Sequence, residues 1–235
     1  MDSTTQRFEI GDGAFYVTRL KPEGSIGSIV FAAGRGGSPT RYAGLLQDFA
    51  DRGFLVVAPH CDMLKSQVPT RADLADRGHK LTLAMIHFCP SALPLYGVGH
   101  SIGAMLLLVL AGAQGLTLSG EELAFSAERR FDRLALFTPP TDFFRRPGAL
   151  SAVVTPMKIW AGGRDKITPP EQSFFLKNAL RDQTEVELLV VEEAGHFAFM
   201  DELPPNIFEP HPARADFLRS LAADTSQFLS ASKPS

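Results

Sequence analysis

The stretch LPLYGVGHSIGAMLLLVLAG, residues 93–112, decides the fold of this chain. Its first part, Leu93 to Val98, is a short apolar run typical of a strand that is covered on both faces. Its last part is almost purely apolar and long enough for a buried helix. Between the two, Gly99-His100-Ser101-Ile102-Gly103 matches the pattern G-x-S-x-G. Glycine at 99 and 103 leaves room for a sharp turn, so the stretch predicts a strand, a turn that presents the Ser101 hydroxyl, and a helix.

Further apolar runs on both sides of this stretch predict alternating strands and helices. The predicted strands are 28–32, 54–58, 133–137, 153–160 and 185–191. The predicted helices are one that begins at Ser38 and Pro39, one over 71–88, one that begins with a capping box at Thr168, Pro169 and Glu171, and one over 212–229. Two β-prone runs, 7–10 and 15–20, predict an N-terminal hairpin. This order indicates an α/β fold, with a doubly wound, mostly parallel sheet and an antiparallel N-terminal edge.

The composition is typical of one medium-sized globular domain. Of the 235 residues 45% are hydrophobic, and we expect a single α/β domain over residues 1–235. The formal net charge of −3, with no basic run, argues against a nucleic-acid partner. Because no apolar run is long enough to span a bilayer and the N-terminal residues lack a signal-peptide pattern, the sequence predicts a cytoplasmic protein. Cys61 and Cys89 are expected to be ordinary reduced thiols.

The Ser101 hydroxyl needs two partners to act as a nucleophile: a base that takes its proton and a carboxylate that orients the base. In folds with this turn, the partners follow in the order serine, acid, histidine, each in a loop after a strand. Asp165 lies in AGGRD, residues 161–165, and His196 lies in AGH, residues 194–196, each after a predicted strand. We therefore predict Ser101, His196 and Asp165 as a catalytic triad.

Other interpretations of these residues stay open. Asp142, Asp201 and Glu202 compete with Asp165 as the acid, and each triad residue taken singly also suits a helix cap or a turn. The remaining histidines form no HExxH pattern and no convergent set of ligands, so we predict no metal and no cofactor; they are His60, His79, His87, His100 and His211.

Acyl transfer passes through a negatively charged tetrahedral oxygen, which backbone N–H groups bind. One donor follows the nucleophile and the other lies in the loop after an earlier strand. Here they would be Ile102 and Arg35, the latter in a glycine-rich loop at 33–37. Such a loop also suits a phosphate, but the lysine–serine pair of a nucleotide-binding loop is missing. A separate hypothesis is that the Arg35 side chain binds an anionic group of the substrate.

Four segments carry a resemblance to a known family: FAAGRGGSPTRYAGLLQDFADRGFLVVAP (31–59), YGVGHSIGA (96–104), WAGGRDKITP (160–169) and EEAGHFAFM (192–200). They resemble the α/β-hydrolase superfamily, and within it the dienelactone-hydrolase-like branch, with further similarity to chlorophyllases and bacterial polyester hydrolases. The resemblance implies an α/β-hydrolase fold and serine hydrolase activity. The chain differs from that branch at Ser101, where dienelactone hydrolases proper carry cysteine, and at Ala33, where a histidine is common.

The expected substrate is a small to medium carboxylic ester in an open site, because only about fifteen residues separate two predicted strands where many relatives insert a lid. Gly34, Phe143, Phe144, Phe197 and Phe199 are the candidate pocket residues. Thioester or amide hydrolysis, acyl transfer and a ligand-binding receptor remain alternatives, and the oligomeric state stays open.

Overall fold

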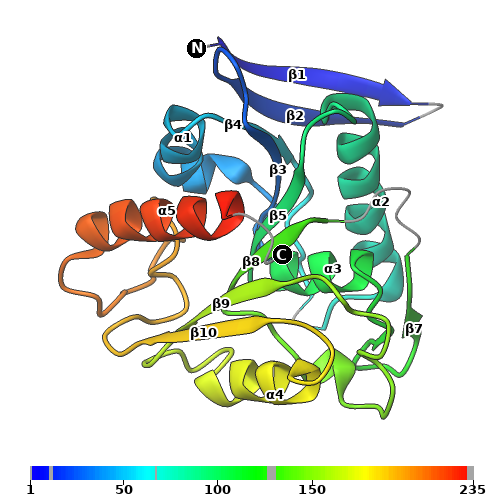
Figure 1. The fold of residues 1–235 in the computed structure, drawn as a ribbon. Helices are drawn as coiled ribbons and strands as arrows, with labels where there is room; N and C mark the ends of the chain where they lie inside the picture. Colours follow the sequence, from blue (N-terminus) through cyan, green and yellow to red (C-terminus); the bar gives the residue numbers. More distant parts are fainter. Residues whose placement is uncertain (1, 11–12, 67, 126–130, 232–235) are drawn as a thin grey trace.

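A mixed sheet organises the structure. This computed structural model describes residues 2–10, 13–66, 68–125 and 131–231, and within them eight strands pair in the order β1-β2-β4-β3-β5-β8-β9-β10. β1 pairs antiparallel with β2, and β2 with β4, whereas the later neighbours are parallel. The strands are β1 (Asp2–Ile10), β2 (Gly13–Lys21), β3 (Gly27–Ala32), β4 (Phe54–Pro59), β5 (Leu95–His100), β8 (Arg133–Phe137), β9 (Met157–Gly162) and β10 (Val186–Val191). This confirms the predicted sheet and its antiparallel edge (Figure 1).

Helices cover both faces of the sheet, as Figure 1 shows. α1 (Ala43–Asp51) and α5 (Arg214–Ser230) lie on one face, and α2 (Arg71–Phe88), α3 (Ile102–Leu110) and α4 (Pro170–Leu180) lie on the other. Alternate side chains of a strand point to opposite faces. In β3, Val30 therefore joins the core under α2 and α3, while Ile29 and Phe31 join the core under α1 and α5. Both faces are apolar, which explains why these strands lack polar alternation.

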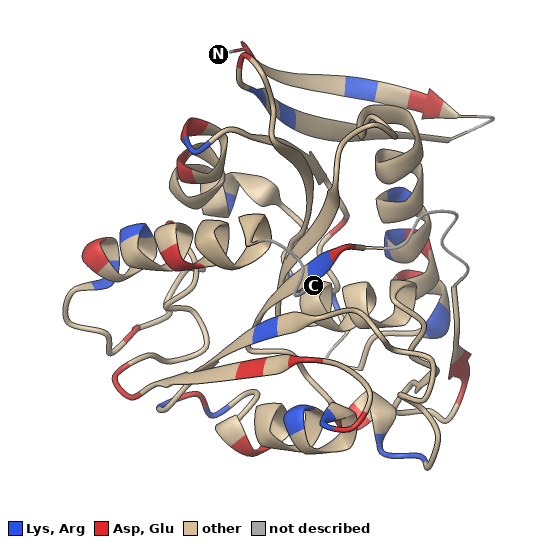
Figure 2. Ribbon diagram, in the orientation of Figure 1, with Lys and Arg blue, Asp and Glu red and all other residues tan. Residues whose placement is uncertain are grey.

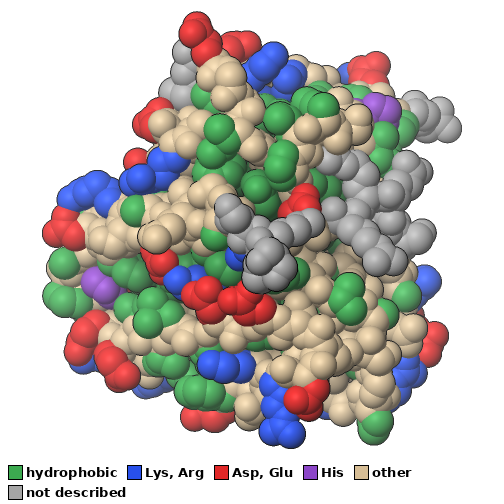
Figure 3. All heavy atoms as spheres, viewed as in Figure 1, with side chains coloured by type: hydrophobic (Ala, Val, Ile, Leu, Met, Phe, Trp, Pro, Cys, Tyr) green, Lys and Arg blue, Asp and Glu red, His purple; other side chains and the backbone are tan. Residues whose placement is uncertain are grey.

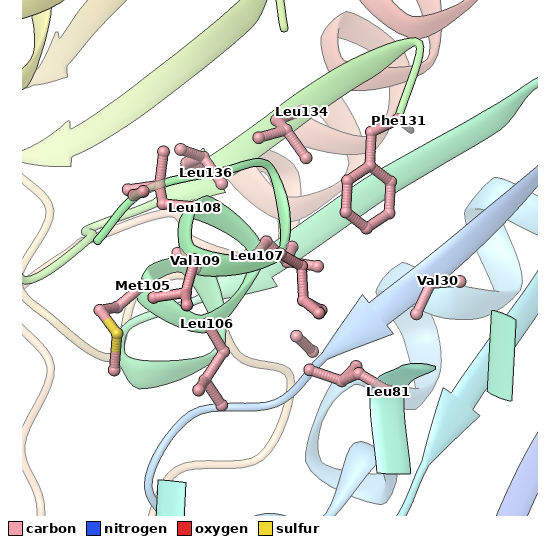
Figure 4. Close-up of a cluster of buried hydrophobic side chains, with 14 of the residues drawn as sticks. Val30, Leu81, Met105, Leu106, Leu107, Leu108, Val109, Phe131, Leu134 and Leu136 are labelled. Carbon is pink, nitrogen blue, oxygen red and sulfur yellow. The ribbon is translucent and has the colours of Figure 1, made fainter. Parts of the chain in front are cut away.

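Every residue of α3 is buried, and the helix carries no charged side chain (Figure 2). Figure 4 shows its leucines packed among Leu81 of α2, Val30 of β3, and Leu134 and Leu136 of β8. Burying one such leucine stabilises the fold by about 2 kcal/mol. The helix that follows Ser101 is therefore held firmly on all sides.

Several boundaries differ from the prediction for local reasons. β9 begins at Met157 and β5 at Leu95, each directly after a proline, which has no N–H for a strand ladder. A short 3-10 helix, η1 (Pro39–Tyr42), precedes α1, and a small unpredicted hairpin pairs β6 (Gly115–Leu116) with β7 (Glu122–Leu123). The prediction of a capping box at Thr168 is wrong. α4 begins at Pro170, and its cap residue, Pro169, makes no side-chain hydrogen bond.

The segment between β8 and β9 is fully described and contains only a short 3-10 helix, η2 (Asp142–Phe144). This agrees with the expectation that no lid is inserted at this point.

Among the described residues, no helix is both long and apolar enough to cross a bilayer. On the face drawn in Figure 3, acidic and basic side chains are interspersed. Lys158, for example, forms ion pairs with Glu187 and Asp224.

Candidate active site

Ser101 occupies a strained turn between β5 and α3. Its φ of 54° lies in a region that residues other than glycine rarely adopt, at a cost of about 1–3 kcal/mol. The turn is held by a hydrogen bond from the Ser101 N–H to the carbonyl oxygen of Phe137, 2.9 Å long. A Cβ at Gly103 would lie 2.0 Å from the carbonyl oxygen of Ala32, and one at Gly99 would lie 2.9 Å from the Ala104 nitrogen. Close packing around the turn therefore requires both glycines.

The structure brings Ser101, His196 and Asp165 into one hydrogen-bonded series. The Ser101 hydroxyl lies 3.0 Å from Nε2 of His196, and Nδ1 of His196 lies 2.7 Å from Oδ2 of Asp165. Asp165 follows β9 and His196 follows β10, so all three residues stand at the carboxyl ends of parallel strands. With its Nδ1 proton donated to the carboxylate, the ring presents an unprotonated Nε2 to the serine hydroxyl.

Local hydrogen bonds keep the Asp165 carboxylate ionised. Oδ1 accepts from the N–H of Ile167 at 2.7 Å and from the N–H of Thr168 at 2.9 Å. Burial alone would raise the pKa of Asp165, but the hydrogen bonds from His196 and Thr168 outweigh it and lower this pKa below its ordinary value. The carboxylate therefore carries its charge throughout the pH range in which a histidine titrates.

Thr168 also belongs to this site, and the sequence did not indicate this role. Its hydroxyl donates to Oδ2 of Asp165 at 2.8 Å and also lies 3.1 Å from Nδ1 of His196. The same oxygen is 3.1 Å from the carbonyl oxygen of Thr138, the residue after β8. The spacing of a threonine three residues after an aspartate is a turn pattern that could have indicated this contact.

Glu209 supports the histidine loop from the far side. Its carboxylate accepts from the N–H of Gly195 at 2.7 Å and from the N–H of Phe197 at 3.2 Å, the two residues that flank His196. A Cβ at Gly195 would lie 2.8 Å from a Glu209 oxygen, so a larger residue there would require the carboxylate to shift. The sequence held no signal for the contact, because Glu209 lies in an irregular proline-rich loop.

A second buried chain of hydrogen bonds links three loops of the site. The N–H of Gly34 donates to the Tyr42 hydroxyl at 3.3 Å, and that hydroxyl lies 2.8 Å from Nδ1 of His100. Nε2 of His100 in turn lies 2.9 Å from the carbonyl oxygen of His196. Burial, followed by the proximity of His196, lowers the pKa of His100 to about 3. The neutral ring therefore donates from Nε2 to the carbonyl and accepts the Tyr42 proton at Nδ1.

The predicted oxyanion donors lie at the start of α3 and in the loop after β3. Ile102 is the first residue of α3, where the N–H has no acceptor within the helix. Arg35 lies in a turn closed by a 3.0 Å hydrogen bond from the Gly37 N–H to the Gly34 carbonyl. The Arg35 guanidinium donates to the carbonyl oxygens of Leu64, at 2.9 Å, and Ser66. Its side chain therefore runs along the neighbouring loop, which does not favour the hypothesis of an anionic substrate group.

Three of the five candidate pocket residues lie in the protein interior. Phe143 and Phe144 are buried in the core under α3, and Phe199 is fully buried against Phe137. We correct this part of the pocket prediction: these aromatic rings fill the protein interior. Phe197 is partly exposed and packs edge-on against the His196 ring, while Gly34 lies against His100.

The competing acids have other partners. Asp142 pairs with Arg145 at the surface, and Glu202 lies near Arg41. Asp201 accepts from the Leu45 N–H at 3.0 Å at the start of α1. Among the described residues, no group of three or more His, Cys, Asp or Glu is placed to hold a metal ion, and Cys61 and Cys89 are not joined in a disulfide.

Solved structures with the same arrangement of strands and helices span almost the whole chain. Esterase 2 from Thermogutta terrifontis, phosphoramylated by tabun, is 18% identical over 99% of this chain and 97% of its own, with a TM-score of 0.67. TT1662 from Thermus thermophilus is 20% identical over 99% and 100%, with a TM-score of 0.65. This chain has the α/β-hydrolase fold. Esterase 2 bound to butyrate gives a TM-score of 0.68, at 18% identity over 98% of this chain and 96% of its own. No family model and no curated protein matches the sequence.

In this structure with the α/β-hydrolase fold, a hollow of about 570 Å³ lies beside the loops that carry Asp165 and His196. The loop 207–210 forms part of its lining, and Phe208 in this loop is 88% exposed. Apolar side chains of Ile167, Phe197 and Phe208 line it together with His196. Charged residues line it as well, including Asp165 and Glu209, and Ser101 is not part of the lining. The hollow is therefore a partly apolar surface beside the His196 ring.

Proposed function

We propose that this chain hydrolyses carboxylic esters through a covalent acyl-enzyme. The observation that carries the proposal is the hydrogen-bonded series of Ser101, His196 and Asp165 at a strained strand-to-helix turn. A serine hydroxyl alone is a weak nucleophile at neutral pH, and this series supplies both the base and the group that orients it. The similarity in fold to esterase 2 from Thermogutta terrifontis also supports the proposal of ester hydrolysis.

In the first half-reaction, Oγ of Ser101 forms a bond to the ester carbonyl carbon while its proton moves to Nε2 of His196. The carbonyl oxygen becomes an oxyanion, which the N–H groups of Ile102 and Arg35 bind. The bond to the alcohol oxygen then breaks, and His196 returns the proton to this leaving oxygen. Asp165 stays ionised and stabilises the protonated imidazole.

In the second half-reaction, water replaces the alcohol. His196 takes a proton from this water as its oxygen attacks the acyl carbonyl carbon, which regenerates the oxyanion. Collapse of the intermediate breaks the bond to Ser101, and Oγ regains its proton from His196. The products are a carboxylic acid and an alcohol, with the enzyme unchanged.

Short acyl chains are the proposed substrates. Esterase 2 from Thermogutta terrifontis has been solved bound to propionate and to butyrate. The test is hydrolysis of p-nitrophenyl acetate, butyrate, octanoate and palmitate, with fluorophosphonate labelling and mass spectrometry of the labelled peptide. We expect steady turnover that is fastest for the shorter esters, and a label on Ser101. Absence of both turnover and label would contradict the proposal and favour a ligand-binding protein.

The hollow beside His196 is proposed to hold the alcohol part of the ester, because His196 must reach the leaving oxygen. Replacing Phe208 by alanine would then raise KM for 1-naphthyl butyrate by about three- to tenfold, since apolar contact area is lost. KM for methyl butyrate should not change. The matched control is Phe174→Ala, because Phe174 is also exposed but lies on α4 and does not line the hollow. Equal effects on both esters would contradict this assignment.

A further inference from the structure

We infer that Arg77 of α2 is the positioning residue that holds the oxyanion-binding peptide of this site in its working orientation; the inference rests on the proposed ester hydrolysis. Arg77 is only 2% exposed. Its described hydrogen bonds all lead to main-chain carbonyl oxygens. Burying a cation is costly unless hydrogen bonds compensate for the lost water. The main-chain segments that supply these carbonyls are therefore the ones that the Arg77 side chain holds in place.

Two of the three carbonyls belong to the glycine-rich loop 33–37, the oxyanion loop, which carries the proposed donor Arg35. Nη1 of Arg77 donates to the carbonyl oxygen of Gly34 at 2.8 Å, and Nη2 donates to that of Arg35 at 2.7 Å. The third bond leads from Nη2 to the carbonyl of Asp62 in the next loop. A planar guanidinium can bridge successive carbonyls with separate donors, which the compact ammonium group of lysine reproduces poorly.

Holding the Gly34 carbonyl also fixes the direction of the Arg35 N–H. Both groups belong to one planar trans peptide, so they point in opposite directions. Since the carbonyl of Gly34 points to Arg77, the N–H of Arg35 is turned away from α2.

The strained turn that carries Ser101 lies next to this loop. A Cβ at Gly34 would be 3.1 Å from Nδ1 and 3.4 Å from the carbonyl oxygen of His100, the residue before Ser101. In addition, a Cβ at Gly103 would be 2.7 Å from the Ala33 carbonyl oxygen. The loop and the first turn of α3 are therefore packed together, as two oxyanion donors must be.

The charge of Arg77 matters because the loop itself resists a peptide flip only weakly. The glycine at 34 lowers the steric barrier to rotating the peptide that follows it. Apart from Arg77, the described donors to the two carbonyls are the N–H groups of Gly37, at 3.0 Å to Gly34, and Leu64, at 3.1 Å to Arg35. Hydrogen bonds from a charged donor are about twice as strong as such neutral ones.

The test compares Arg77→Met and Arg77→Lys with Arg71→Met. Arg71 is a matched control, because it lies on the same helix and donates from Nε to the carbonyl of Glu122 at 3.0 Å, away from the site. The measurements are kcat and KM for p-nitrophenyl butyrate, the inhibition constant of phenylboronic acid, which forms a tetrahedral adduct with a serine, and the pH profile. Far-UV circular dichroism checks the fold.

We expect both Arg77 variants to lose about 10- to 100-fold in kcat, somewhat less than removal of an oxyanion donor, with KM within about threefold. The inhibition constant of phenylboronic acid should rise by a similar factor, while the midpoint of the pH profile stays in place because His196 and Asp165 are untouched. Arg71→Met should match the wild type. A purely structural role would not link kcat to boronate binding.

Other outcomes would overturn the inference. If the wild type turns over and the Arg77 variants keep kcat and boronate affinity, the inference fails while the proposed function stands. A loss of kcat without a change in boronate affinity has the same meaning. If both Arg77 variants fail to fold, Arg77 serves the stability of the fold instead. A wild type that neither hydrolyses esters nor reacts with fluorophosphonate would overturn the proposed function itself, and this inference with it.

Discussion

Replacing Ser101 by alanine is expected to lower kcat for p-nitrophenyl butyrate by about 10⁵- to 10⁶-fold. The alanine variant has no oxygen that can form the acyl-enzyme, so only binding and the oxyanion donors remain to accelerate attack by water. KM should change little, because the hydroxyl contributes mainly to the transition state. The measurement is steady-state hydrolysis, with fluorophosphonate labelling as a parallel test. Residual activity above about 1% of wild type would point to a different nucleophile.

A glycine at the same position separates activity from backbone strain. Ser101→Gly should be as inactive as the alanine variant, yet its free energy of unfolding should rise by about 1 kcal/mol relative to Ser101→Ala. The reason is that glycine adopts the positive φ of this residue without steric cost, which outweighs its larger loss of chain entropy. Denaturant unfolding of both variants checks this difference. Equal stability would mean that the turn is not strained.

Replacing Asp165 by asparagine is expected to lower kcat by about 10⁴-fold. The amide would offer the Nδ1 side of His196 a neutral group, so the tautomer that leaves Nε2 free to accept the serine proton is no longer favoured. The charge that stabilises the protonated imidazole is also lost. Asp142→Asn is the matched control, because Asp142 is a competing acid that pairs with Arg145 at the surface. A loss of the same size in the control would reassign the acid.

The pH dependence of stability provides a second test of Asp165. Its pKa is lowered in the folded protein, so ionisation of Asp165 stabilises the fold above the pKa of the unfolded chain, about 4. This contribution is lost as pH falls through the folded pKa. The difference in unfolding free energy between wild type and Asp165→Asn should therefore shrink below about pH 4. A difference that is independent of pH would show that the Asp165 charge makes no net contribution.

Two neighbours of His196 are expected to keep a fixed charge at neutral and mildly acidic pH. Asp165 remains ionised at these pH values, and His100 is kept neutral by burial until about pH 3. Neither group therefore changes charge over this pH range. The three side chains have separate electrostatic roles although they lie in one small region.

Sequence alone was sufficient for features that depend on neighbours along the chain. The strand, turn and helix around Ser101 follow from local apolar runs and from glycines that close packing requires. Asp165 and His196 could be placed because the ends of parallel strands meet at one edge of a sheet. The predicted alternation of strands and helices was confirmed for the same reason, since both faces of a doubly wound sheet demand apolar residues.

Tertiary structure decided what depends on contacts between loops. Thr168 fits a helix cap in sequence, but it bonds Asp165 because the chain turns back on itself before α4. Glu209 and Arg77 reach main-chain groups of the histidine and oxyanion loops across large separations in sequence. Main-chain donors and acceptors look alike at every position, so no residue pattern marks such partners. Phe199 shows the converse: its position after His196 suggested a pocket, and only packing against Phe137 placed it in the core.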